Sequence, residues 1–177
     1  RKVGEDALER VAVIKLNGGL GTSMGLEHAK SLLEVRDGAT FLDLIARQVL
    51  GLRRRTGGDV PLLLMDSFRT RRESLAALRR HPDLEHEGVP LSFLQHRVPK
   101  VDAETLTPVS WPADRELEWC PPGHGDLYTA LSTSGVLDAL LERGIDMAFV
   151  SNADNLGAVL DARLLGWMVE HGIEMMM

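Results

Sequence analysis

The chain has 177 residues, of which 44% are hydrophobic, enough to form the core of one substantial domain. Its formal net charge of −6 argues against a general nucleic-acid-binding protein, because such proteins usually present a basic face. The single cysteine, Cys120, excludes an internal disulfide and is compatible with a reducing cytoplasm, and the sequence shows neither a signal peptide nor an apolar run of membrane-spanning length.

Strand and helix patterns alternate along the chain. The expected order is strand 11–14, helix 41–55, strand 61–65, helix 70–80, strand 91–95, helix 126–143, strand 147–150 and helix 161–171. Thr40 is suited to capping the first helix, and Asp126 and Asp161 are expected to cap the last two. The alternation predicts an α/β fold, with a mostly parallel, mixed sheet flanked by helices in one domain over residues 1–177.

Two segments are less regular. Residues 98–118 contain prolines and are expected to be irregular, with a hairpin through 106–110. The apolar residues at 173–177 have the pattern of a strand that is cut off, and the first residue is arginine rather than methionine. We therefore expect the domain to be incomplete.

The most informative segment is Leu-Asn-Gly-Gly-Leu-Gly-Thr-Ser-Met-Gly at 16–25, which follows the first strand and precedes Lys30. Glycines allow tight turns and close approach of backbone N–H groups to a ligand, and a nearby lysine neutralises phosphate charge. The segment therefore predicts a nucleotide-phosphate loop, with a glycine-rich surface turn as the alternative. A P-loop would need lysine at position 26, where the chain has leucine. A dinucleotide-binding fingerprint would need glycine at position 24, where the chain has methionine, and this second mismatch disfavours an oxidoreductase.

Four motifs occur in the order found in one enzyme family. The first is the glycine-rich segment with the preceding lysine, residues 15–25. The others are Lys-Ser-Leu at 30–32, Pro-Pro-Gly-His-Gly-Asp at 121–126 and Val-Ser-Asn-Ala-Asp-Asn-Leu-Gly-Ala at 150–158. Together they resemble the UTP–glucose-1-phosphate uridylyltransferases of the eukaryotic-like type, over nearly the whole chain from about Val11. One departure is Ala29, where the family usually has proline.

The resemblance implies a Rossmann-like (GT-A-like) nucleotidyltransferase domain that forms UDP-glucose and pyrophosphate from UTP and glucose 1-phosphate with Mg²⁺. It assigns nucleotide contacts to Leu16, Asn17, Gly18, Gly19, Gln95 and Gly123, sugar-phosphate contacts to His124 and Asn152, the catalytic cation to Lys30 and the Mg²⁺ ligand to Asp154. The implied partners are these two small substrates, with no nucleic acid and no membrane, and the sequence carries no signal for an oligomeric state.

Several of these residues have simpler interpretations when the resemblance is set aside. Asp154 is equally suited to an Asx turn or a helix cap, and His124 to a structural role in its loop. Gln95 alone would be a surface residue, and Lys30 could pair with Glu34 on the surface.

Two other functions stay open from the sequence. One is a related enzyme that uses another sugar 1-phosphate, such as that of N-acetylglucosamine or galactose. The other is a non-catalytic nucleotide-binding fragment, because the second active-site lysine and the C-terminal domain of the family lie beyond residue 177.

Overall fold

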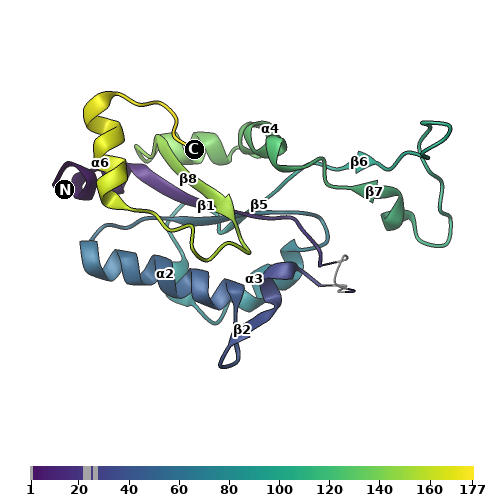
Figure 1. Cartoon of the computed structure of the whole chain (residues 1–177), viewed down its shortest axis with the longest axis horizontal. Coiled ribbons are helices and arrows are strands. Elements are labelled where there is room, and N and C mark those ends of the chain that lie inside the picture. Colours follow the sequence, from purple (N-terminus) through teal and green to yellow (C-terminus); the bar gives the residue numbers. More distant parts are fainter. Residues whose placement is uncertain (1, 22–24, 26–27) are drawn as a thin grey trace.

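The computed structural model describes residues 2–21, 25 and 28–177, and its centre is a four-stranded sheet (Figure 1). The strands are β1 (Val11–Asn17), β4 (Leu62–Asp66), β5 (Ser92–Leu94) and β8 (Met147–Asn152). They lie in the order β5-β4-β1-β8, and every neighbouring pair is parallel. The predicted α/β class is confirmed, and this sheet is wholly parallel rather than mixed.

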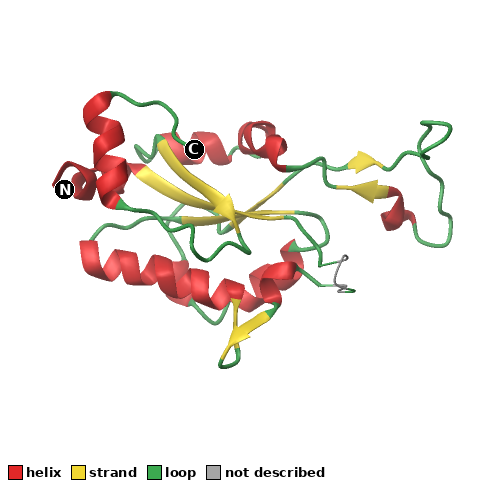
Figure 2. Ribbon diagram, in the orientation of Figure 1, coloured by secondary structure: helices red, strands yellow, loops and turns green. Residues whose placement is uncertain are grey.

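Helices flank the sheet on both faces, as Figure 2 shows. The helices are α1 (Lys2–Asp6), α2 (Phe41–Thr56), α3 (Arg71–Leu78), α4 (Leu127–Thr133), α5 (Val136–Leu141) and α6 (Ala162–His171). Single 3₁₀ turns are η1 (Ala7–Arg10), η3 (Lys30–Leu32), η4 (Pro82–Leu84), η5 (Arg115–Glu118) and η6 (His124–Asp126). Across the part of the chain that the structure describes, no helix is long and apolar enough to cross a membrane.

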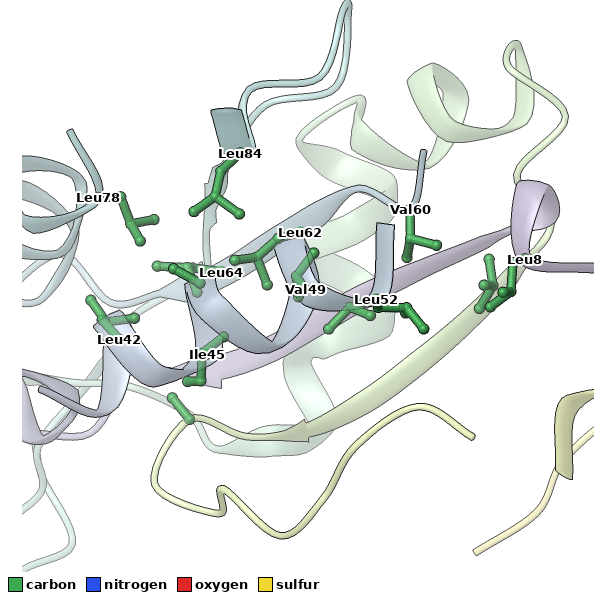
Figure 3. Packing of buried hydrophobic residues seen from close by; sticks show 14 of the residues in the cluster. Leu8, Leu42, Ile45, Val49, Leu52, Val60, Leu62, Leu64, Leu78 and Leu84 are labelled. Carbon is green, nitrogen blue, oxygen red and sulfur yellow. The ribbon is translucent and has the colours of Figure 1, made fainter. Parts of the chain in front are cut away.

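The side chains of β1 alternate between two hydrophobic clusters. Val11 and Val13 pack with α2, α3 and η4 in one cluster, whose leucines, isoleucine and valines interlock in Figure 3. Ala12 and Ile14 pack with α4 and α5 in the other cluster. Because both faces are covered, β1 is a central strand, as its nearly continuous apolar sequence predicted.

The two ends of the described chain meet through a close contact between α1 and α6. A Cβ atom on Gly4 would lie 1.7 Å from the carbonyl oxygen of Ala162, and one on Gly166 would lie 2.8 Å from the amide nitrogen of Gly4. Glycine is therefore required at both positions for these backbones to approach so closely.

The structure corrects three expectations. The single helix expected at 126–143 is divided into α4 and α5, because Gly135 adopts the left-handed conformation (φ 74°) between them. The hairpin expected at 106–110 is wider, with β6 (Val98–Pro99) pairing antiparallel to β7 (Trp119–Cys120) at the base of a projecting arm (Figure 1). Residues 173–177 form no strand.

A hairpin that the sequence analysis missed joins β2 (Glu34–Arg36) to β3 (Ala39–Thr40). Its turn residues Asp37 and Gly38 both have positive φ angles, of 52° and 74°. Asp-Gly is a favoured pair for such turns, so the signal was present in the sequence.

The first turn of α2 confirms the predicted Thr40 cap and adds a reciprocal partner. Thr40 Oγ1 accepts from the Asp43 amide at 3.2 Å, while the Asp43 carboxylate accepts from the Thr40 amide at 2.9 Å. Asp43 also bonds His81 at 2.9 Å and pairs with Arg80 at 3.1 Å, which ties α2 to the end of α3. Burial by itself raises the pKa of Asp43, but the bonds from His81 and Thr40 and the charge of Arg80 together lower it to about 2.

This lowered pKa predicts a defined window of acid sensitivity. Because the folded-state pKa of about 2 lies below the ordinary value of 3.8, the charge of Asp43 stabilises the fold above about pH 4. That contribution is lost as the pH falls from 4 to 2. We expect Asp43→Asn to lower the melting temperature at pH 5 and to differ much less from the parent at pH 2.5. Asp37→Asn is the control, because Asp37 is exposed beside Arg36; a difference that is the same at both pH values would contradict the assignment.

Candidate functional site

The predicted site residues gather at the carboxyl edge of the sheet. The chain crosses from β1 through β4 to β5 on one side and later returns to β8 on the other side of β1. Open α/β sheets bind ligands at such a switch point, where the loops after two neighbouring strands diverge. Asn17 ends β1 opposite Asp66, and Leu16 lies opposite Asn152 of β8.

The glycine-rich segment follows β1, and its first residues are paired with the residues just before η3. The Lys30 amide donates to the carbonyl oxygen of Gly19 at 3.2 Å, and Leu20 forms an isolated antiparallel bridge with Ala29. Residues 22–24 of the predicted phosphate loop, and residues 26 and 27 after it, lie outside the described residues. Ala29 is buried at the position where the family usually has proline, and Lys30 follows it as the first residue of η3.

The ammonium of Lys30, at the start of η3, meets the carboxylate of Asp154 in the loop that follows β8. Lys30 Nζ lies 2.6 Å from Asp154 Oδ2, and both side chains are partly exposed to solvent. The structure therefore places Lys30 against Asp154 and not against Glu34. The two residues that the sequence marked for phosphate and metal are in direct contact, although they come from distant parts of the chain.

Beneath this edge, Asp66 is fully buried in a network of polar side chains. Asn17 Nδ2 donates to Asp66 at 2.6 Å and to Ser74 at 2.8 Å, and Ser92 Oγ donates to Asp66 at 2.5 Å. Burial raises the pKa of Asp66, and the hydrogen bonds from Ser92 and Asn17 oppose that rise. The side-chain amide of Asn17 is therefore directed into the fold, and the nucleotide contact predicted for Asn17 stays a prediction.

Gln95 follows β5 and is buried, although its sequence pattern alone suggested a surface residue. The backbone amide of Gln95 donates to the backbone carbonyl of Asp66 at 2.9 Å, so the pairing of β5 with β4 continues through Gln95. Its side chain lies against Gly18, where an added Cβ would come within 1.8 Å of Gln95 Nε2. Gly18 thus makes room for the side chain predicted to contact uracil.

The loop that carries Gly123 and His124 is joined to β5 by Asp126. One oxygen of Asp126 accepts from the His96 amide at 2.6 Å and the other contacts His96 Nδ1 at 2.9 Å. Asp126 forms no side-chain cap on α4, so the predicted N-cap is wrong, whereas Asp161 does cap α6. Through this clamp, the residue after Gln95 is held to the loop predicted to face the sugar.

The two residues predicted to contact the sugar phosphate are both exposed. His124 opens η6 directly after Gly123, which has a φ angle of 114° that favours glycine. Asn152 is the last residue of β8, two positions before Asp154. Both lie in segments that follow the carboxyl ends of strands, and their roles remain predictions.

Sequence analysis treated Lys15 only as part of a motif, but it is one of the most deeply buried side chains. It is 2% exposed, and burial lowers its pKa to about 8. A sequence signal was available, because strand alternation places position 15 on the same face as Val11 and Val13.

The side chains at this edge of the sheet limit how the expected Mg²⁺ could be held. Among the described residues, no group of three or more histidine, cysteine, aspartate or glutamate side chains is arranged to hold a metal ion. Mg²⁺ commonly takes only one or two protein carboxylates together with substrate phosphates, rather than a cage made wholly by protein. A single accessible carboxylate such as Asp154 fits that mode.

An open parallel sheet with its polar groups at a switch point places this chain in the class of α/β proteins that bind ligands at the carboxyl ends of their strands. The sequence profile of one family within that class, UTP–glucose-1-phosphate uridylyltransferase, matches residues 1–177. The chain belongs to this family.

Individual relatives agree with the family match. The chain is 48% identical over 171 residues to the UTP–glucose-1-phosphate uridylyltransferase of Saccharomyces cerevisiae. The aligned residues make up 96% of this chain and 34% of that protein. The Solanum tuberosum enzyme of the same name is 42% identical over 163 residues, covering 92% of this chain and 34% of that protein. The chain therefore spans about a third of the length of these relatives.

Solved structures confirm the fold. UDP-glucose phosphorylase from Trypanosoma brucei superposes with a TM-score of 0.88 at 48% identity, covering 94% of this chain and 36% of that chain. An S374F mutant of UDP-glucose pyrophosphorylase from Leishmania major, in complex with UDP-glucose, gives a TM-score of 0.86 at 45% identity, covering 96% and 36%.

The contact between Gly18 and Gln95 yields a prediction. Gly18→Ala places a methyl group within 1.8 Å of Gln95 Nε2, so the buried amide must move. We expect a loss of about 1–3 kcal/mol in the free energy of unfolding, the usual cost of overpacking. Gly19→Ala is the matched control, because a Cβ there meets open space. Adding Gln95→Ala should remove most of the extra cost of Gly18→Ala; strictly additive effects in denaturant titrations would exclude the contact.

Proposed function

We propose that the protein forms UDP-glucose and pyrophosphate from UTP and glucose 1-phosphate. Membership of the uridylyltransferase family supports this activity, and so do the names of relatives that are more than 40% identical. Because the chain spans about a third of those relatives, the proposal concerns the full-length protein. The observation that carries it is the contact of Lys30 with Asp154 at the mouth of the glycine-rich segment.

The reaction asks the protein for alignment and charge stabilisation rather than covalent chemistry. An oxygen of glucose 1-phosphate attacks the α-phosphorus of UTP in line, and pyrophosphate leaves. Backbone N–H groups near Gly18 and Gly19 hold the nucleotide phosphates, and Lys30 counters the charge that moves toward the leaving group. Gln95 pairs with the carbonyl and N–H edge of uracil. His124 and Asn152 orient the sugar phosphate.

Asp154 is the residue that would hold Mg²⁺ through its carboxylate. A bound Mg²⁺ would supply positive charge that lowers the repulsion between two anionic substrates. Lys30 Nζ already contacts Asp154 Oδ2, so this carboxylate already stabilises one positive charge. When the nucleotide binds, Lys30 turns from Asp154 to a phosphate oxygen.

A substrate comparison tests the proposal directly. With the full-length protein, pyrophosphate release should require both UTP and glucose 1-phosphate and should be much slower with ATP, because adenine presents a different hydrogen-bonding edge to Gln95. The 1-phosphates of galactose and N-acetylglucosamine in place of glucose 1-phosphate test the sugar. Equal rates with ATP and UTP would refute the uridine assignment, and a preference for another sugar would refute glucose.

Lys30 should matter more to the rate than to the fold. Its pair with Asp154 is partly exposed, and exposed ion pairs add little stability. We expect Lys30→Ala to lower kcat by about 10²-fold or more, with a smaller change in KM and little change in melting temperature. Lys30→Arg should restore little, because its planar group cannot replace a compact charge. Lys100→Ala on the exposed arm is the control, and a Lys30→Ala rate within a few-fold of the parent would show that this lysine is not catalytic.

Asp154 should behave in the same way if it holds the metal. We expect Asp154→Ala to lower turnover strongly and to leave the melting temperature nearly unchanged. A capping role would give the opposite pattern, with a stability loss of about 0.5–2 kcal/mol and a near-normal rate. Asp161→Ala provides that comparison, because Asp161 is an observed helix cap.

A further inference from the structure

Lys15 presents an unusual buried charge in the middle of the sheet. Its side chain is 2% exposed, and in the ranges that the structure describes no carboxylate forms an ion pair with it. Burying a charge without an opposite partner is costly unless its donors are hydrogen-bonded. The position therefore needs an explanation beyond packing, since an apolar side chain would fill the same space at lower cost.

The ammonium of Lys15 joins two segments on either side of Asp154. Its Nζ donates to Ser151 Oγ at 2.7 Å and to the carbonyl oxygen of Ala158 at 2.9 Å. Ser151 lies in β8 directly opposite Lys15 in the parallel ladder, whereas Ala158 lies in the loop beyond Asp154. Nζ also lies 5.6 Å from the centre of the Phe149 ring, whose face favours a cation.

The loop between β8 and α6 is also held by other contacts, because Ala153, Leu156 and Leu160 pack with the hydrophobic cluster under α2. The Ala153 amide donates to the Leu16 carbonyl at 3.0 Å, so the beginning of the loop is fixed by the β1 backbone. Gln48 of α2 donates to the Leu156 carbonyl at 3.0 Å, and Lys15 holds the carbonyl of Ala158. Strand β1 thus anchors the loop before Asp154 through its backbone and after it through one side chain.

A cavity beside Lys15 leaves room into which the loop could move. A cavity of about 160 Å³ lies between α2, β1, β8 and the loop, and its lining includes Lys15, Val49 of α2, Phe149 of β8 and Leu160 of the loop. Without the bond to the Ala158 carbonyl, the loop can settle into this cavity. The lowered pKa of Lys15, about 8, reflects the same apolar surroundings and leaves the amine protonated at neutral pH.

We infer that Lys15 is a positioning residue whose buried ammonium holds the loop 152–158 at the height where Asp154 faces Lys30 and the glycine-rich segment. In this way it sets the affinity of the site for a divalent cation. The Lys15 side chain lies on the face of the sheet that α2 covers and acts only through the loop. The metal part of this inference rests on the proposed function, whereas the anchoring of the loop does not.

The test replaces Lys15 with methionine in the full-length protein, which keeps an unbranched chain and removes the donors. Amide hydrogen exchange should become at least tenfold faster at Asn155 and Ala158, whose amides are hydrogen-bonded within the loop, and stay unchanged in α2. The melting temperature should be equal to or higher than that of the parent, because an isolated buried charge has been removed. Mn²⁺ binding in the presence of UTP, followed by electron paramagnetic resonance, should weaken by about tenfold or more.

Arg55→Met is the matched control, because Arg55 lines the same cavity from α2 and the change removes the same charge. It should leave loop exchange and Mn²⁺ affinity as in the parent. If Lys15→Met does not fold, Ser151→Ala decides the matter, because it removes the hydroxyl that orients the Lys15 ammonium toward the Ala158 carbonyl. Loop exchange should again increase. A lower melting temperature with faster exchange throughout would show that Lys15 is merely structural and would overturn the inference.

The two proposals fail in different ways. If the parent binds no Mn²⁺ with UTP, the proposed function is wrong, and the exchange data alone decide whether Lys15 anchors the loop. If the parent binds Mn²⁺ and Lys15→Met binds it equally well with unchanged loop exchange, the inference is wrong and the proposed function stands.

Discussion

The parallel pairing of β1 with β4 on one side and β8 on the other is the constraint on which the whole site depends. The register sets Asn17 opposite Asp66 and Leu16 opposite Asn152. Because strand side chains alternate, a shift of one residue would turn Lys15 and Asn17 to the opposite face. The hydrophobic clusters on both faces oppose such a shift, so the core of the sheet is also what aligns the polar groups at its edge.

Polar groups on β1 are stabilised by donors and acceptors from every neighbouring element. Asn17 bonds to Asp66 of β4 and Ser74 of α3, and Lys15 bonds to Ser151 of β8. Each of these groups would be costly if left without a partner inside the fold. The edge that carries the site is therefore rigid beneath its surface, while Lys30 and Asp154 above it remain accessible to solvent.

Local sequence signals were sufficient for most of the framework. The helix at α2 follows from its 3.6-residue period and its Thr40 cap, and the four strands follow from short apolar runs between turn residues. The split at Gly135 was missed because a glycine within a helical pattern is compatible with either a continuous helix or a break. The resemblance to the family marked Lys30 and Asp154, but their mutual contact is non-local and has no signature in either segment.

The errors at single residues have the same origin. Asp126 has the sequence context of a helix cap, yet its carboxylate is taken by His96 from the loop after β5. Gln95 has the context of a surface residue, yet it is enclosed by Gly18 and the end of the sheet. In both cases the decisive partner comes from another strand, so the topology had to be known before the side chain could be placed.

The glycine contact between α1 and α6 bears on how the protein forms during synthesis. Gly4 leaves the ribosome well before its partners Ala162 and Gly166, which lie about 160 residues further along the chain. At about 5–20 residues per second, α1 must wait roughly ten to thirty seconds for α6. During that interval β1 can pair with β4 but has no β8 beside it, so one edge of this central strand stays open. Nascent chains of this protein therefore expose a strand edge of the kind that chaperones protect.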